Sequence, residues 1–162
     1  MRSAEETALR KLSDRSLSVF ELRNFLLRKN YDLDEIESVI TEFLKWGYLD
    51  DERFCKEYFR YAFGKNRGKR RVFMELGQRG VDRDVISQAY EDFLFELHEE
   101  GEELDEMTMA KRETEKILRL ADLSREEPIP EKIRGRIGRK LQSLGSSAGI
   151  IYSILEELKR EY

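Results

Sequence analysis

Apolar residues recur at helical spacing along most of the chain, with polar residues between them. The clearest example lies between residues 33 and 46, where the apolar positions are Ile36, Val39, Ile40, Phe43 and Leu44. This spacing is that of an amphipathic helix with one buried face. Gly47 follows, and glycine readily takes the left-handed conformation that ends many helices. The pattern therefore predicts a helix over 33–46 that ends at Gly47.

Similar patterns predict the other helices. One begins after Ser18, where Glu21 three residues later completes a capping box, and it ends near Asn30. Further periodic segments predict helices over 4–12, 51–63 and 106–121.

The same design occurs three times. When the sequence is aligned with itself, three leucines occupy equivalent positions, and they are Leu26, Leu76 and Leu141. We call them the anchors. The residues four positions later all tolerate a helix-ending backbone, and they are Asn30, Gly80 and Gly145. The residues ten positions later are all isoleucine: Ile36, Ile86 and Ile151. We therefore predict an all-α fold of three tandem three-helix repeats, which form an elongated array with its curvature left open.

The expected boundaries follow from this alignment. Repeat 1 spans 1–49, repeat 2 spans 50–97, an acidic linker covers 98–104, and repeat 3 spans 105–162.

Composition narrows the class of protein. Charged residues make up 40% of the 162 residues, and only 2 prolines occur, as expected for solvated helices. The 30 basic and 34 acidic residues nearly cancel, which gives a formal charge of −4. A nucleic-acid-binding role must therefore come from local clusters of charge.

Several kinds of chemistry have no support in the sequence. The single cysteine, Cys55, excludes an intramolecular disulfide, and the single histidine, His98, excludes a histidine cluster for a metal or a catalytic triad. No nucleotide-binding glycine motif occurs. We expect no cofactor, no metal and no catalysis. No signal sequence and no run of about 18 apolar residues occurs, so we expect a cytoplasmic protein.

Basic residues concentrate in the second helix of each repeat and acidic residues in the third. The clusters of repeats 2 and 3 are Lys65, Arg67, Lys69, Arg70, Arg71, Lys132, Arg134, Arg136, Arg139 and Lys140. Solubility and internal salt bridges are one explanation for such residues. Residues 69–71, however, begin a helix, where the dipole disfavours cations, and a phosphate backbone or an acidic protein surface would explain them better.

A second cluster lies around residue 51. Asp50 and Asp51 precede the apolar face formed by Phe54 and Tyr58. Two adjacent acids could serve as a metal or acid–base pair, but helix caps are the more common use, and Arg53 is a nearby ion partner.

These residues carry a resemblance to a known family. Leu49–Phe54 with Tyr58, the Lys/Arg-Gly segment after it, and Leu76 with Gly80 resemble the central signature of the RecX family. The resemblance extends to Ser18–Leu22 and Lys140–Gly145, and so covers most of the chain. Two departures are Cys55, where alanine is usual, and Ser146, where an aromatic residue is usual.

The resemblance implies a monomeric regulator of the RecA recombinase, active in DNA repair, homologous recombination and the SOS response. Such proteins lie in the groove of the RecA–DNA filament and limit its growth, ATPase and strand exchange. The residues expected to contact the filament or single- or double-stranded DNA are Lys65, Arg67, Lys69, Arg70, Arg71, Lys132, Arg136, Arg139 and Lys140. The signature residues Asp50, Asp51, Arg53, Phe54 and Tyr58 are expected to hold the repeats together. The residues alone also permit a DNA-binding helical module that needs no recombinase, or a structural adaptor.

Overall fold

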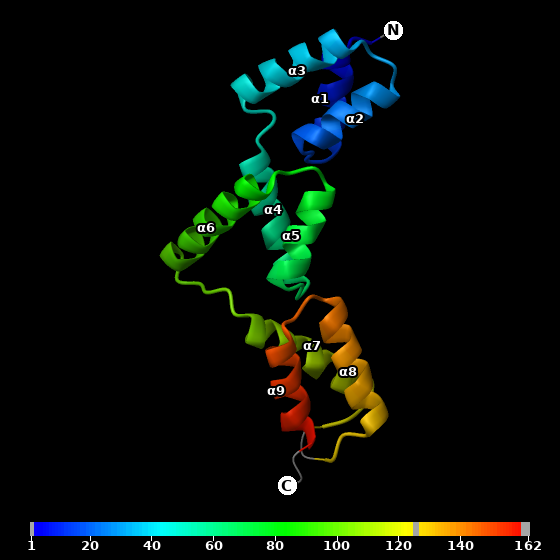
Figure 1. The fold of residues 1–162 in the computed structure, drawn as a ribbon, viewed down its shortest axis with the longest axis vertical. Coiled ribbons are helices and arrows are strands. Elements are labelled where there is room, and N and C mark those ends of the chain that lie inside the picture. Colours follow the sequence, from blue (N-terminus) through cyan, green and yellow to red (C-terminus); the bar gives the residue numbers. More distant parts are fainter. Residues whose placement is uncertain (1, 125–126, 160–162) are drawn as a thin grey trace. The chain divides into compact units, whose positions relative to one another are not determined.

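The computed structural model describes residues 2–124 and 127–159, and every regular element in those ranges is an α-helix (Figure 1). The helices are α1 (Ala4–Asp14), α2 (Val19–Arg28), α3 (Leu33–Trp46), α4 (Asp51–Gly64), α5 (Lys69–Gln78), α6 (Arg83–Glu99), α7 (Glu106–Leu120), α8 (Glu131–Ser143) and α9 (Ala148–Lys159). The predicted all-α class is confirmed. None of these helices combines the length and apolarity needed to cross a bilayer.

The predicted start of α2 and the predicted end of α3 are also confirmed. The Ser18 hydroxyl accepts from the Glu21 N–H at 3.1 Å, and the Glu21 carboxylate accepts from the Ser18 N–H at 3.1 Å. This reciprocal pair satisfies two backbone donors that the first turn of α2 leaves free. At its other end, α3 stops at Gly47, whose φ is 81°.

The three-fold repeat is visible in the backbone. The anchors Leu26, Leu76 and Leu141 are all fully buried. The residues four positions later all have a positive φ: 66° at Asn30, 84° at Gly80 and 85° at Gly145. Glycine takes this conformation without a Cβ clash and asparagine at a modest cost, so the sequence alignment identifies the helix ends of all three repeats.

The chain divides into two compact units that do not coincide with the repeats. The N-terminal unit comprises Met1–Tyr58 and Met74–Phe95, and the C-terminal unit comprises Phe59–Phe73 and Glu96–Tyr162. The division falls inside α4, α5 and α6, so repeat 2 contributes residues to both units. The boundaries expected for the repeats and the elongated array therefore stay predictions.

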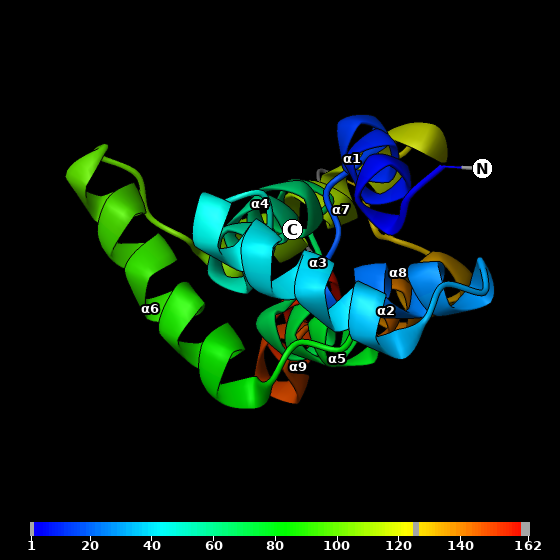
Figure 2. The same cartoon turned by 90° about the horizontal axis from the view of Figure 1, so that it is seen from above.

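In the N-terminal unit, α1, α2 and α3 pack around one apolar core, and they lie next to one another in both ribbon views (Figures 1 and 2). The largest side chains of this core are at most 2% exposed, and they are Leu22, Leu26, Ile36, Phe43 and Leu49. Burying each such side chain contributes about 1.5–3 kcal/mol, before entropic costs.

In the C-terminal unit, α7, α8 and α9 pack in the same way around Leu118, Ile137, Leu141 and Ile154. The apolar face of α8 is narrow, since only Ile137 and Leu141 of this helix are buried. Most of α8 is therefore open to solvent.

Consecutive repeats form hydrogen bonds between residues at equivalent sequence positions. Ser18 lies eight residues before its anchor, and its hydroxyl donates at 2.7 Å to the carbonyl of Arg79, three residues after the next anchor. Gly68 also lies eight residues before its anchor, and its N–H donates at 2.6 Å to the carbonyl of Leu144, again three residues after the next anchor. The first contact lies within the N-terminal unit and the second within the C-terminal unit. We call this pair of contacts the repeat junction.

Candidate partner-binding surface

One face of α8 carries four cationic side chains. Lys132, Arg136, Arg139 and Lys140 stand at spacings of 0, 4, 7 and 8, which places them on a common face. All four are exposed, and within the described part of the chain none forms a hydrogen bond or ion pair. Buried Ile137 and Leu141 lie on the opposite side of the helix.

This arrangement costs stability. Lys132 and Arg136, and Arg136 and Lys140, are i, i+4 pairs of like charge, and each such pair destabilises a helix by about 0.2–0.5 kcal/mol. Because no internal ion pair among the described residues offsets the cost, this face of α8 fits a negatively charged partner better than a role in folding.

The start of α5 carries the other predicted cluster. Arg70 is exposed and, among the described residues, has no hydrogen-bond or ion-pair partner. The ammonium of Lys69 lies 5.3 Å from the centre of the Phe73 ring. Arg71 is half-buried, and its guanidinium donates to the carbonyl of Ser143 at 2.8 Å.

These contacts change the explanation for cations at a helix start. Arg71 binds a carbonyl in the last turn of α8, where the helix dipole favours positive charge. The Glu106 carboxylate accepts from the Lys69 N–H at 2.8 Å and so supplies negative charge at the start of α5. Arg71 therefore has an internal role, and an external partner is needed only to explain Arg70.

The connection between α4 and α5 holds Lys65 and Arg67. Lys65 is exposed, whereas the Arg67 guanidinium lies 5.3 Å from the centre of the Tyr61 ring. Between them Asn66, with a φ of 62°, donates to the buried Glu113 carboxylate at 3.2 Å. The loop that carries these cations is thus anchored to α7.

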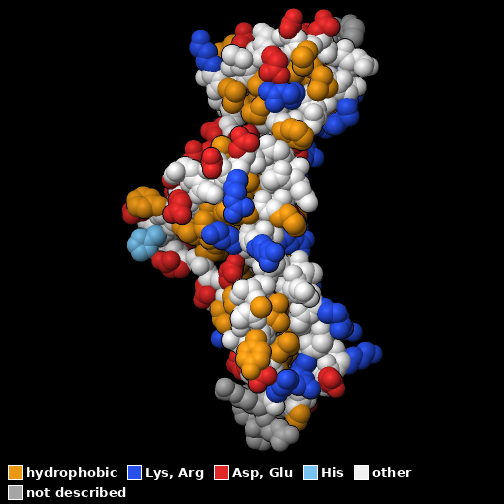
Figure 3. Space-filling model, viewed as in Figure 1, with side chains coloured by type: hydrophobic (Ala, Val, Ile, Leu, Met, Phe, Trp, Pro, Cys, Tyr) orange, Lys and Arg blue, Asp and Glu red, His pale blue; other side chains and the backbone are white. Residues whose placement is uncertain are grey.

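The structure brings the two predicted clusters of the C-terminal unit together, since the N–H of Gly68 meets the end of α8. Figure 3 shows Lys and Arg side chains along α8 and over the start of α5. We call the following set the basic surface: Lys65, Arg67, Lys69, Arg70, Arg71, Lys132, Arg136, Arg139 and Lys140.

The signature residues have structural roles in the N-terminal unit. Asp50 caps α4, as predicted, because its carboxylate accepts from the Arg53 N–H at 3.1 Å. Phe54 is 3% exposed, and the Arg79 guanidinium lies 5.6 Å from its ring centre and 5.1 Å from that of Tyr58. Arg53 itself is exposed.

Asp51 makes a long-range contact whose partner could not be identified from the sequence. It is the first residue of α4, and its carboxylate accepts from the Val19 N–H, at 2.9 Å, instead of capping its own helix. Burial raises the pKa of Asp51 above the usual 3.8, the hydrogen bond from Val19 opposes that shift, and the carboxylates of Asp50, Asp82 and Glu21 add to it. The contribution of this carboxyl to stability is therefore greatest below pH 3.8 and is lost as the pH rises through its native pKa.

The role of Asp51 can be tested with two variants. Asp51→Asn keeps an oxygen acceptor without a charge, so its stability relative to the parent protein should rise between pH 3.8 and neutral pH. Asp51→Ala leaves the first N–H of α2 without this acceptor and should cost about 1–2 kcal/mol. Urea unfolding across this pH range measures both effects. If the asparagine variant proved as unstable as the alanine variant at neutral pH, the carboxylate charge would be what holds α2.

The remaining reactive side chains have ordinary surroundings. Cys55 is fully buried, and burial raises the pKa of its thiol to about 12, so almost no nucleophilic thiolate forms at neutral pH. His98 is exposed, and its Nδ1 lies 2.8 Å from the Glu103 carboxylate. Among residues 2–124 and 127–159, no cluster of three or more potential metal ligands occurs.

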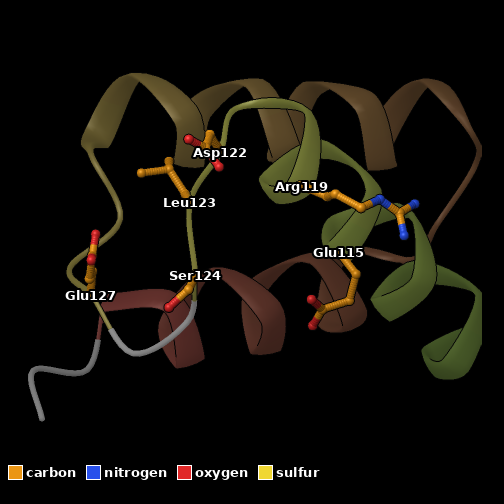
Figure 4. Close-up of a pocket in the computed structure, with 6 residues that line it drawn as sticks. All are labelled: Glu115, Arg119, Asp122, Leu123, Ser124 and Glu127. Carbon is orange, nitrogen blue, oxygen red and sulfur yellow. The ribbon is translucent and has the colours of Figure 1, made fainter.

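A hollow of about 280 Å³ lies near the end of α7 (Figure 4). Its lining residues are Glu115, Arg119, Asp122, Leu123, Ser124 and Glu127. It contains none of the residues predicted to bind a partner, and its three carboxylates do not form a metal-binding group.

Comparison with known proteins gives a consistent picture. The profile of the RecX first three-helix domain matches residues 4–43, and that of the RecX second three-helix domain matches residues 50–89. The regulatory protein RecX of Vibrio vulnificus (strain CMCP6) is 39% identical over 90 residues, which is 56% of this chain and 59% of that protein. The chain thus spans little more than half the length of this relative. The RecX protein of Legionella pneumophila (strain Corby) is 26% identical over 162 residues, covering 100% of this chain and 99% of that one.

Solved structures support the fold. The crystal structure of RecX from Lactobacillus salivarius superimposes with a TM-score of 0.70 at 20% identity, over 96% of this chain and 94% of that chain. A second crystal structure, of a regulatory protein RecX, gives a TM-score of 0.71 at 18% identity, over 95% of this chain and 71% of that one.

Proposed function

Because this chain belongs to the RecX family of regulatory proteins, we propose that it binds the filament that RecA forms on DNA and inhibits it. The inhibited activities are the filament's ATPase, its extension and strand exchange. The protein acts in the cytoplasm, in recombination and repair, as a monomer without a cofactor.

In this proposal the protein acts by binding alone. A protein that binds one state of a filament more tightly than another shifts the equilibrium toward the favoured state. By bridging or capping RecA protomers, the protein would favour states that do not extend, and the filament would shorten.

The observation that carries the proposal is the face of α8 with Lys132, Arg136, Arg139 and Lys140. These cations face solvent, lack partners among the described residues and lower helix stability. A filament that contains DNA and acidic protein surface supplies the negative charge that would compensate them.

The test separates stability from function. Arg136→Glu with Lys140→Glu reverses two charges of the basic surface. The carboxylate at 136 lies four residues from Lys132, which stabilises α8, whereas the carboxylate at 140 stands in the last turn, where the dipole opposes it, so the stability of α8 should change by less than about 1 kcal/mol. The matched control is Arg112→Glu with Lys116→Glu, two exposed cations at the same spacing on α7. We expect the first pair to raise the concentration for half-inhibition of RecA's DNA-dependent ATPase at least tenfold, and the control to leave it unchanged.

If both double variants inhibited the RecA ATPase equally well, the basic surface would not be the surface that binds the filament. The ATPase assay should include rising substoichiometric amounts of the parent protein. Inhibition well below one molecule per RecA protomer would show action at filament ends or sparse sites.

The basic surface also supports a second candidate, a DNA-binding module that needs no recombinase. This candidate predicts tight binding to bare DNA that weakens steeply with salt, because bound cations release counterions. Unchanged RecA ATPase together with such binding would favour it over the regulator.

A further inference from the structure

A second positively charged feature lies in the N-terminal unit, whereas the residues of the basic surface belong to the C-terminal unit. It is a hollow of about 300 Å³ between α1, α2 and the end of α5. It is lined by Lys11, Arg15, Leu17, Phe20, Glu21, Asn24, Phe25, Arg28, Gln78 and Arg79. We call it the α1–α2 groove.

The groove carries an excess of positive charge. Four of its lining residues are cationic and only one, Glu21, is acidic. The Glu21 carboxylate is shared between Arg15, at 3.5 Å, and Arg79, at 3.8 Å. It therefore leaves the other two cations without a carboxylate in the groove.

Lys11 and Arg28 are those two cations. The ammonium of Lys11 lies 5.0 Å from the centre of the Phe25 ring, a contact that leaves its N–H groups available to an anion. Arg28 is exposed and has no hydrogen-bond or ion-pair partner among the described residues. An anion bound here would gain hydrogen bonds without displacing an internal partner.

The groove also offers an aromatic surface. Phe20 is 45% exposed, and its inner edge rests against Gly80, which lacks a side chain that would push the ring away. Asn24 and Gln78 provide amide groups that, within the described chain, form no hydrogen bond. Cations, an exposed ring and unused amides together are the features of sites that bind unpaired nucleotides.

We propose that the α1–α2 groove binds single-stranded nucleic acid, with a phosphate between Lys11 and Arg28 and a base stacked on Phe20. A single strand is required because a paired base presents no open face to the ring. The groove is at the small end of ligand pockets, which suits one nucleotide of a longer strand. Such binding needs no recombinase, so it can succeed or fail independently of the function proposed above.

Photo-cross-linking of the full-length chain locates the strand directly. An oligothymidylate that carries 5-iodouracil cross-links to aromatic side chains in contact with the base. We expect a cross-link in the tryptic peptide of residues 16–23, whose only aromatic residue is Phe20. Cross-links confined to other peptides would overturn the proposal.

Binding of the same oligonucleotide, followed by fluorescence anisotropy, tests the roles of the residues. Phe20→Leu keeps an apolar contact with Gly80 but removes the ring, and should weaken binding at least fivefold. Arg28→Glu changes an exposed residue, so the fold should persist. Because one phosphate contact is lost, the fall of log affinity with log salt should become less steep by about 0.7. The control Arg83→Glu makes the same change at an exposed residue outside the groove.

Competition identifies the ligand. Equal competition by duplex DNA of the same length would overturn the proposal, because the base would then not need to be unpaired. Displacement by oligoglutamate but not by unlabelled oligothymidylate would overturn it in favour of an acidic protein segment.

Discussion

Gly80→Ala is expected to lower the free energy of unfolding by about 3 kcal/mol, because two costs add. An alanine at a φ of 84° costs about 1–2 kcal/mol, since the left-handed conformation crowds Cβ. In addition, a Cβ here would overlap Cγ and Cβ of Phe20. Rotation of the Phe20 side chain does not move its own Cβ, so α2 must shift, and overpacking of this kind costs about 1–3 kcal/mol.

Gly47→Ala is the matched control for this prediction. Gly47 has nearly the same φ, 81°, but a Cβ added there meets nothing within 4 Å. Only the conformational cost applies, and we expect a loss of about 1 kcal/mol. Thermal or urea unfolding of the two variants measures the difference. Equal losses would show that α2 and the end of α5 separate at no cost.

Gly68→Ala is expected to cost about 3 kcal/mol for a different reason, a clash with backbone atoms. The φ of Gly68 is not in the left-handed region, so alanine meets no conformational penalty there. A Cβ at Gly68 would, however, lie 2.5 Å from the carbonyl oxygen of Gly145 and 2.8 Å from its carbon. Backbone atoms cannot rotate away, and the hydrogen bond from Gly68 to Leu144 would lengthen or break.

The control for Gly68 lies further along, in α5. A Cβ at Gly77 meets nothing within 4 Å, and alanine is the better helix former, so Gly77→Ala should raise stability by up to about 1 kcal/mol. The two glycine-to-alanine changes are therefore expected to have opposite signs in the same unfolding experiment. If Gly68→Ala were also stabilising, the contact between the repeats would be unimportant for folding.

Local sequence features predicted local structure well. The capping box at Ser18 and the positive-φ residues Asn30, Gly80 and Gly145 follow from side-chain chemistry within a few residues. Helix periodicity and capping depend on neighbours three or four residues apart, and the sequence displays these directly.

Contacts over long sequence separations were not predictable in this way. Asp51 was expected to cap a helix or to help hold the repeats together, but the sequence did not identify its partner, the N–H of a residue 32 positions earlier. Arg71 was expected to need an external partner, but it binds a carbonyl 72 positions later. Glu113 is 5% exposed, and its carboxylate accepts from Asn66, a residue 47 positions earlier. Each depends on how helices pack, which periodicity does not encode.

The two candidate surfaces also differ in whether the sequence could predict them. The cations of α8 could be found from sequence because their spacing alone puts them on one face. The α1–α2 groove could not, because it gathers Lys11 from α1, Arg28 from α2 and Arg79 from the turn after α5, and nothing in the spacing of these residues joins them.

The repeat junction has an evolutionary consequence. A duplicated gene segment that encodes one three-helix repeat would carry a donor eight residues before its anchor and an acceptor carbonyl three residues after it. Inserted between two existing repeats, such a copy would form the junction hydrogen bond with the repeat before it and with the repeat after it. No compensating substitution would be needed. The acceptor is a backbone carbonyl, and the donor at Gly68 is a backbone N–H, so that contact depends on the glycine itself but on no other particular side chain at the donor or the acceptor. Lineages could therefore gain or lose whole repeats in single genetic steps, whereas a deletion that ended inside a repeat would leave a buried polar group unpaired.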